Sequence, residues 1–408
     1  MRGRSLDYAR DDTGRGRDDT GRGRDDTGRG RDDNKQKGSG SMNEGRAVGE
    51  GGGRKVYLDW IRVIAIALVL FNHLPGYALY ENGGAGRPFY LLCTLITRIN
   101  VPLLLMVSGT LLLEREEPVG KVLKHRVLRI AGALVAAYVG LYLLRAAHDT
   151  VLYGAPFAFN FAELIPGILG RSLITADAAS YWYLYAYLGY LLMLPFLRKA
   201  VRGMERSHWM LLLALHGIIY TALPLINLLL PEENRLYLSA DFSVPLATTQ
   251  AFFYTIAGYW LDRHDGFMNT GKKTLLTALA GLAATCAAGA VFLLTTGADE
   301  GLTPMYMTLF DWVTAFCAFL VIKRVTTVTL PGLSRGKHAK RIAFVSSLCF
   351  GIYLFDPWLK MVLFGPYYRA ASFLPEMIRS LVWIVISMAI GGLVTFVLKK
   401  IPGIRKLL

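Results

Sequence analysis

Long apolar runs alternate with short polar stretches along the chain from Val56 to its last residues. A helix needs about 20 predominantly apolar residues to cross the hydrocarbon core of a bilayer, and the runs have roughly that length. The runs cover residues 56–80, 89–113, 127–147, 181–197, 208–230, 244–261, 274–296, 303–322, 342–364 and 377–398. This pattern predicts an all-α, polytopic integral membrane domain with about ten transmembrane helices.

Lysine and arginine are distributed unevenly among the loops that join these runs. The second, fourth, sixth and eighth loops and the C-terminal end together hold 21 lysine and arginine residues. The other loops hold only Arg87, Arg171, Arg235 and Arg369. Basic loops of membrane proteins stay in the cytoplasm. The split therefore predicts a multi-pass protein of the cytoplasmic membrane with both termini in the cytoplasm, and it supports the ten-helix count, because one missed span would destroy the alternation.

The N-terminal residues differ in composition from the rest of the chain. Residues 11–31 repeat the heptad Asp-Asp-Thr-Gly-Arg-Gly-Arg three times. Such a segment cannot bury enough apolar surface to offset the loss of chain entropy. We expect a disordered, low-complexity cytoplasmic tail over residues 1–54 and a ten-helix membrane domain over residues 55–408. A basic tail that binds anionic lipid or a partner is the alternative.

Composition excludes several classes of function. The chain is 53% hydrophobic and 18% charged with a formal net charge of +15, but its cations flank apolar runs, where membrane orientation explains them, so we expect membrane lipid and no nucleic acid as a partner. The four cysteines lie inside apolar runs without CxxC spacing. No HExxH, P-loop or Rossmann glycine pattern occurs, so no metal site is predicted.

Four ionisable residues inside the predicted spans lie at a similar depth. At the helical rise per residue, His73, Arg98, Asp311 and Asp356 each fall about 10 to 13 Å below the outer ends of their runs. Charged groups are costly in hydrocarbon and usually face a cavity or a partner. We therefore predict one shared buried site, in which the arginine and the aspartates offset charge and His73 is a titratable base. The alternative is a structural ion-pair network.

Several segments occur in an order that is typical of one family of membrane enzymes. They are Arg62 and His73 with ten residues between them, Arg98 before VPLLLMVSG, the Arg-x-x-Arg pair Arg126 and Arg129, the run WYLYAYLGYLLMLPFL from Trp182, and CFGIYLFDP from Cys349. From about residue 55 to residue 400 the chain thereby resembles the membrane-bound acyltransferase-3 family. That family includes O-acetyltransferases of surface polysaccharides, enterobacterial common antigen and peptidoglycan.

The resemblance implies both a reaction and roles for individual residues. Acyl-CoA, with acetyl-CoA expected, would approach from the cytoplasm, and its acyl group would pass to a hydroxyl of an extracytoplasmic glycan or glycolipid. His73 would be the catalytic residue, and Arg98 would stabilise the developing oxyanion. Arg126 and Arg129 would bind the CoA phosphates at the cytoplasmic mouth, and Arg62 would continue that path inward.

One position departs from the family pattern, and it leaves other functions open. In the motif CFGIYLFDP, which begins at Cys349, many relatives have histidine before the proline, whereas this chain has Asp356. An aspartate can orient an imidazole, but it cannot donate a hydrogen bond while ionised. The alternatives are a glycan or lipid transporter or flippase, whose charges would line a pathway, and an inactive relative that acts as a scaffold for glycan-synthesis partners.

Overall fold

The computed structural model describes residues 54–74, 87–157, 159–170, 180–239, 241–295 and 308–408. These residues belong to one compact unit that begins at Arg54. The tail predicted over residues 1–54 lies outside the described residues apart from Arg54. Within the described part of the chain, every regular element is a helix and no strand occurs, so the predicted all-α class is confirmed.

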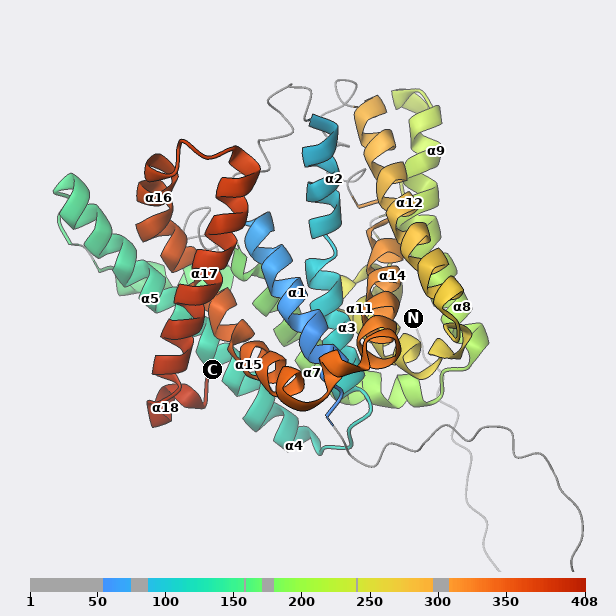
Figure 1. Cartoon of the computed structure of the whole chain (residues 1–408), viewed down its shortest axis with the longest axis horizontal. Helices are drawn as coiled ribbons and strands as arrows, with labels where there is room; N and C mark the ends of the chain where they lie inside the picture. Colours follow the sequence, from blue (N-terminus) through green and yellow to red (C-terminus); the bar gives the residue numbers. More distant parts are fainter. Residues whose placement is uncertain (1–53, 75–86, 158, 171–179, 240, 296–307) are drawn as a thin grey trace, which may run out of the picture. The chain divides into compact units, whose positions relative to one another are not determined.

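Figure 1 shows the α-helices in their order along the chain. They are α1 (Val56–Asn72), α2 (Arg87–Thr97), α3 (Asn100–Leu112), α4 (Val119–Val122), α5 (Leu128–Tyr153), α6 (Phe161–Gly170), α7 (Trp182–Arg202), α8 (Arg206–Gly217), α9 (Leu223–Leu229), α10 (Pro245–Thr248), α11 (Gln250–Arg263), α12 (Gly271–Thr295), α14 (Asp311–Arg324), α15 (Gly336–Leu359), α16 (Gly365–Ala370), α17 (Glu376–Leu398) and α18 (Pro402–Arg405). Short π-helical turns, among them Leu123–Val127 and Lys360–Phe364, join α4 to α5 and α15 to α16.

Seven helical segments in the described residues are long and apolar enough to cross a membrane. The three remaining predicted runs are helical as well: α1 has 17 residues, α7 has 21 and α11 has 14. The protein is thus a multi-pass membrane protein by the length and composition of its helices. The count of ten spans and the cytoplasmic position of the termini stay predictions.

The predicted second span is not one continuous helix. Residues 98 and 99 form a turn between α2 and α3. The reason lies in Pro102, which has no N–H to donate to the carbonyl of Arg98 four residues earlier and whose ring would clash with that carbonyl. The break lets the start of α3 contribute to a cavity, as described below.

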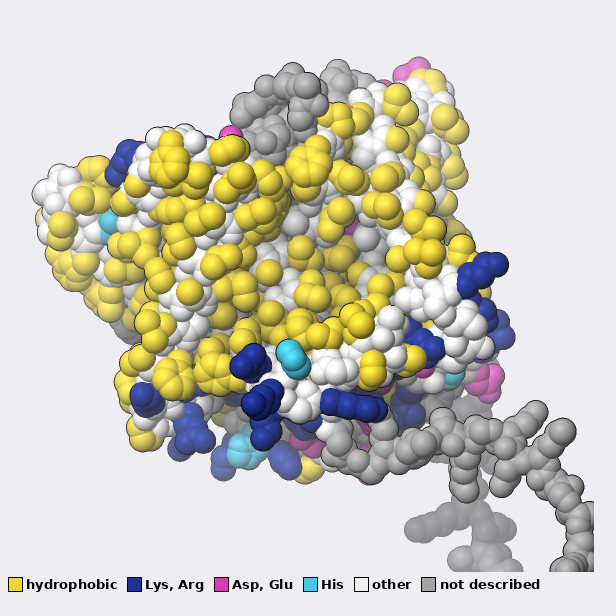
Figure 2. Space-filling view, viewed as in Figure 1, with side chains coloured by type: hydrophobic (Ala, Val, Ile, Leu, Met, Phe, Trp, Pro, Cys, Tyr) yellow, Lys and Arg dark blue, Asp and Glu magenta, His cyan; other side chains and the backbone are white. Residues whose placement is uncertain are grey.

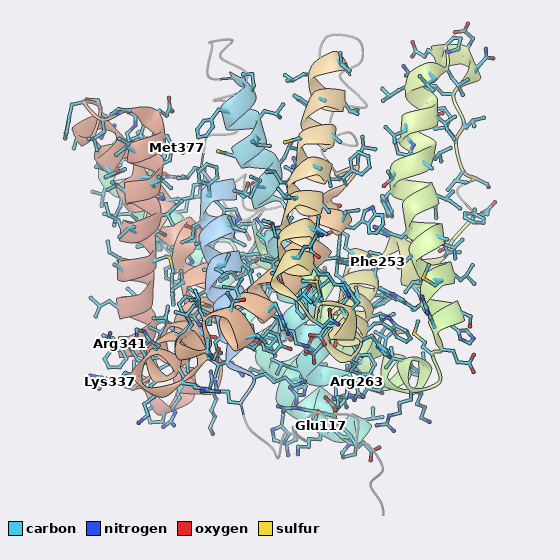
Figure 3. The ribbon with its side chains drawn as sticks, turned by 45° about the vertical axis from the view of Figure 1, so that its right-hand side comes forward. Glu117, Phe253, Arg263, Lys337, Arg341 and Met377 are labelled. Carbon is cyan, nitrogen blue, oxygen red and sulfur yellow. The ribbon has the colours of Figure 1, made fainter. Side chains whose placement is uncertain are left out.

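Basic side chains gather at one end of the bundle, and hydrophobic side chains cover its sides (Figure 2). Figure 3 shows Glu117, Arg263, Lys337 and Arg341 near this end and Met377 near the opposite one. We call the first the basic end and the second the distal end. This arrangement is typical of a membrane protein whose loops carry the charge and whose lipid-facing surface is apolar.

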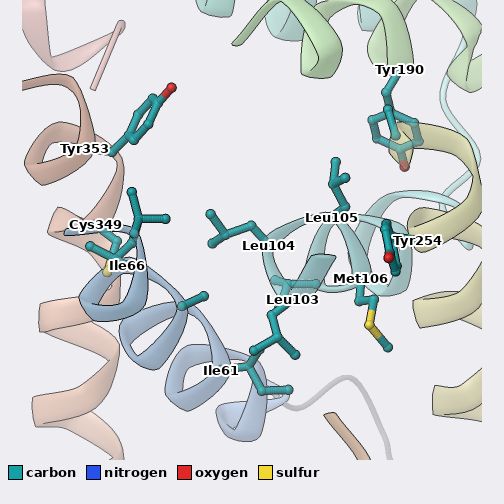
Figure 4. Packing of buried hydrophobic residues seen from close by; sticks show 14 of the residues in the cluster. Ile61, Ile66, Leu103, Leu104, Leu105, Met106, Tyr190, Tyr254, Cys349 and Tyr353 are labelled. Carbon is teal, nitrogen blue, oxygen red and sulfur yellow. The ribbon is translucent and has the colours of Figure 1, made fainter. Parts of the chain in front are cut away.

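The core is built around α3, which packs against α1 on one side and α11 on the other. The contact with α11 is close because Gly109 and Gly258 lie at it: a Cβ on Gly258 would approach the main-chain oxygen of Met106 to 2.2 Å. Figure 4 shows Leu104 directed from α3 toward α1 and the helix of Tyr353, with Met106 on the other side. Helices α1, α3 and α15 thereby form the frame of the site.

Candidate active site

A cavity of 330 Å³ opens between α1, α3, α7 and α15 toward the distal end of the bundle. Its lining includes Asn72 and His73 at the end of α1, Asn100 at the start of α3, and Asp356 near the end of α15. We call it the distal cavity. Three different helices therefore bring these polar side chains to one space inside an otherwise apolar bundle.

His73 and Asp356 form a hydrogen-bonded pair in the wall of this cavity. Nδ1 of the imidazole lies 2.7 Å from Oδ2 of Asp356, whose side chain is 1% exposed. The other carboxylate oxygen accepts a hydrogen bond of 3.2 Å from Ser387 on α17. An ionised carboxylate can only accept, so Nδ1 carries a proton and a neutral imidazole keeps its lone pair on Nε2. This tautomer is the one that a general base requires.

The end of α1 is fixed by contacts with the broken second span. Thr97, the last residue of α2, donates a hydrogen bond of 2.9 Å to the side chain of Asn72. Asn100, at the start of α3, is buried and donates to the main-chain oxygen of Leu68. The ammonium of Lys360 donates to the main-chain oxygen of His73 itself. The imidazole is therefore held through both its ring and its backbone, which limits its movement.

A second cavity, of 390 Å³, lies nearer the basic end and adjoins the first. Leu104, Tyr183 and Tyr353 line both cavities and therefore lie at the boundary between them. We call the second space the central cavity. Arg62 lines it and donates hydrogen bonds to Asp59 at 3.2 Å and to Ser346 at 2.6 Å.

A third cavity, of 250 Å³, lies at the basic end and adjoins the central cavity. The two share Arg126, Arg129, Ile130 and Tyr187, and the third is also lined by Lys121 and His125. We call it the basic cavity. The structure thus brings the three arginines that the sequence suggested for cofactor binding to two neighbouring spaces on the basic side of His73.

One carboxylate organises the arginines of the basic cavity. Glu117 accepts two hydrogen bonds from Arg126, at 2.9 and 2.7 Å, and one of 2.9 Å from the buried Arg198. The hydrogen bond from Arg126 is the largest cause that lowers the pKa of Glu117 from 4.5 to about 2. Arg129 instead donates to the main-chain oxygens of Leu407 and Leu408. The carboxylate therefore fixes the Arg126 guanidinium in one orientation at the opening.

Comparison with known proteins identifies this arrangement. The family model described as an acyltransferase domain, the acyltransferase-3 type, matches residues 55–399 of the chain. The chain belongs to the acyltransferase-3 family. It matches no curated protein and no solved structure closely enough to add to this finding. The resemblance inferred from the sequence motifs is thereby confirmed, and the match supports acyltransferase activity in general.

Two of the residues predicted for the site of this acyltransferase lie elsewhere. Asp311, the first residue of α14, accepts a hydrogen bond of 3.2 Å from Tyr254 on α11. Arg98, in the turn after α2, interacts electrostatically with Asp311. Neither residue lines the distal or the central cavity. The structure therefore does not bring all four ionisable groups into one cavity, because the break after α2 and the start of α14 direct Arg98 and Asp311 to another cluster. The catalytic roles of these residues stay predictions.

The structure also adds residues that sequence reasoning missed. Lys360 lines the distal cavity, and Ser387 completes the hydrogen bonds of Asp356. Lys360 escaped notice because it lies inside an apolar run and not in a loop, although its place four residues after Asp356 on the same helix was a usable signal. Trp182 and Tyr183, the first residues of the run WYLYAYLGYLLMLPFL, also line this cavity.

Proposed function

We propose that this acyltransferase moves a short acyl group, acetyl in the first instance, from acyl-CoA to a hydroxyl group of an extracytoplasmic glycan or glycolipid. The reaction would take place within the cytoplasmic membrane. The donor would enter from the basic end and the acceptor from the distal end. The observation that carries the proposal is the stacking of the cavities, with arginines at one end and the His73–Asp356 pair at the other.

The order of lining residues along each helix supports a continuous path. On α1, Arg62 lines the central cavity and His73 the distal one; on α15, Ser346 lines the central cavity and Asp356 the distal one. Helices α3 and α7 run in the opposite direction and pass from the distal to the central cavity. Both cavities thus lie along the long axes of the same four helices, as a donor that crosses part of the membrane would require.

His73 would do the proton chemistry of the transfer. Nε2 accepts the proton of the acceptor hydroxyl while the hydroxyl oxygen forms a bond to the thioester carbonyl carbon. When the carbon–sulfur bond breaks, the imidazolium returns its proton to the departing thiolate, so an O-acyl ester and free CoA result. Asp356 stabilises the imidazolium between these steps and keeps Nδ1 protonated.

The basic and central cavities would bind the donor. Phosphate groups prefer the planar donors of arginine and the point charge of lysine, and Arg126, Arg129 and Lys121 line the basic cavity. From there the extended arm of the substrate would pass Tyr187 and Arg62 toward Tyr183, which lines both the central and the distal cavity. The thioester would then lie near His73, across the boundary between the two cavities.

Acyl transfer by the purified protein tests the proposal. Wild type and His73→Ala would be reconstituted in nanodiscs with acetyl-CoA and a panel of glycans, and both CoA release and O-acetyl groups would be measured. His338→Ala, an exposed histidine in the helical turn at the basic end, is the matched control. Transfer that His73→Ala abolishes and the control retains is expected. Equal transfer by all three proteins, or glycan movement across a bilayer without acylation, contradicts the proposal.

A further inference from the structure

Lys360 places an ammonium group in the wall of the distal cavity. It is the first residue of the π-helical turn that follows α15. Its one polar contact among the described residues is the hydrogen bond to the main-chain oxygen of His73, and no described carboxylate forms an ion pair with it. An ammonium has three N–H donors. Two of them therefore have no protein acceptor in the described part of the cavity.

The position of Lys360 along its helix separates it from the donor side. In sequence order, Ser346, Cys349 and Phe350 line the central cavity, Tyr353 lines both, and Asp356 and Lys360 line the distal cavity. Lys360 follows Asp356 by about one helical turn, toward the distal end. Lys360 therefore shares a cavity with His73 and not with the arginines.

A positive charge at this depth needs an electrostatic reason. Lys360 lies within an apolar run, where a cation is costly unless it reaches water or an opposite charge. The one carboxylate in the described lining, Asp356, is turned toward His73 and Ser387, so it does not neutralise Lys360. An anionic group that enters with a ligand would satisfy the two remaining N–H donors and balance the charge.

We propose that the acceptor carries an anionic group, a carboxylate or a phosphate, close to the hydroxyl that is acylated, and that Lys360 binds this group. Trp182, which is 37% exposed and lines the same cavity, provides an aromatic face for the sugar ring. The proposal rests on the proposed function, because it identifies the acceptor of that reaction. It specifies an acidic sugar or a sugar phosphate and disfavours a neutral glycan.

The placement argues against a role for Lys360 in stabilising the oxyanion. The oxyanion forms on the thioester carbonyl, which would arrive from the central cavity, whereas Lys360 lines only the distal cavity. A group that binds the acceptor changes KM for that acceptor, whereas a group that stabilises the oxyanion changes kcat for every acceptor. Kinetics with charged and neutral acceptors therefore separate the two roles.

The test uses the full chain in nanodiscs with three matched acceptors: a disaccharide that contains a uronic acid, its neutral carboxyl-reduced form, and a glycosyl phosphate. Binding is measured by calorimetry and acetyl transfer by CoA release. Lys360→Gln, whose amide can still donate to the oxygen of His73, is expected to raise Kd and KM for the preferred anionic acceptor about 10- to 100-fold, the usual effect of losing a charged hydrogen bond.

The same variant should change KM for the neutral acceptor by no more than about threefold, and any loss of kcat from the altered hydrogen bond to His73 should be the same for all three acceptors. Lys360→Arg should restore most of the affinity, because it keeps the charge. Arg369→Gln, which removes an exposed cation of α16 near the distal end, is the control and should change nothing. Whether the carboxylate or the phosphate responds more strongly identifies the source of the anion.

Two results would overturn the inference. One is a wild-type protein that binds the neutral disaccharide as tightly as both anionic acceptors. The other is a Lys360→Gln variant whose Kd and KM change equally for all three acceptors, whatever its effect on kcat. Absence of transfer to any acceptor refutes the proposed function instead, and the binding measurements still decide the inference, since a preference for anions that Lys360→Gln removes would support it without any turnover.

Discussion

Replacing Asp356 with asparagine tests the central pair of the site with almost no change in volume. The carboxylate is 1% exposed, lies 2.7 Å from Nδ1 of His73, and accepts a second hydrogen bond from Ser387. In the variant, a carboxamide replaces a group that can only accept. If its NH₂ faces the ring, Nδ1 becomes the acceptor and the proton moves to Nε2, where the base is needed.

The expected loss follows from the charge that the substitution removes. A carboxylate about 4 Å from the charge of an imidazolium stabilises it by about 4 kcal/mol at an effective dielectric constant of about 20. That energy corresponds to about a thousandfold in rate. Ser387→Ala removes only a neutral donor at 3.2 Å and should cost about 1 kcal/mol, or roughly fivefold.

Acetyl transfer in nanodiscs, followed by CoA release with a thiol reagent, measures both variants. Circular dichroism and elution as a single species show whether Asp356→Asn remains folded. A folded Asp356→Asn protein with activity within about fivefold of wild type would refute the assignment of His73 as a base oriented by this carboxylate. The same result for Ser387→Ala would be in line with it.

Two further predictions concern Glu117 in the basic cavity and Gly258 at the contact between α11 and α3. Glu117→Gln should lower stability by at most about 3 kcal/mol at neutral pH, because the pKa of Glu117 is depressed from 4.5 to about 2 by Arg126. This contribution to the free energy of unfolding is present above pH 4.5 and is lost as the pH falls toward 2. In thermal unfolding in detergent, the difference in melting temperature between wild type and Glu117→Gln should therefore decrease over that pH interval. Gly258→Ala, whose methyl group would lie 2.2 Å from the main-chain oxygen of Met106, should destabilise the protein by about 3 kcal/mol. Gly189→Ala meets nothing within 4 Å and should be neutral or slightly stabilising in the same thermal assay.

Most of the helices could be predicted from the sequence because a membrane span has a simple requirement of length and hydrophobicity. Interruptions of a span are harder to predict from hydropathy, since apolar residues continue across them. The break at Arg98 illustrates this, because Pro102 was visible in the sequence but the hydrophobic average of the run hid its effect. The two-part run of α10 and α11, separated at Thr249, is a second case.

The depth of each ionisable residue in its predicted span indicated which residues lie at one level, but it did not indicate which of them face the same cavity. Residues at one level of a bundle share a height, whereas a site also needs them to face the same space. His73 and Asp356 face each other, but Asp311 faces Tyr254, and no helical count from one sequence fixes the rotation of α14 relative to α1. The four-residue spacing of Asp356 and Lys360 did not depend on that rotation, because both residues lie on one helix.

Under the two proposals, this spacing would link proton transfer to recognition of the acceptor. Asp356 bonds to the side chain of His73, and Lys360 bonds to its main-chain oxygen, so one helical segment contacts His73 at two points with opposite charges. The charge of Lys360 stays unbalanced in the described lining until an anionic acceptor binds, because the carboxylate of Asp356 is bonded to His73 and Ser387. Under the two proposals, a displacement of α15 would change both the orientation of the imidazole and the affinity for an anionic acceptor. Acyl transfer and acceptor binding should therefore vary together in variants of this helix.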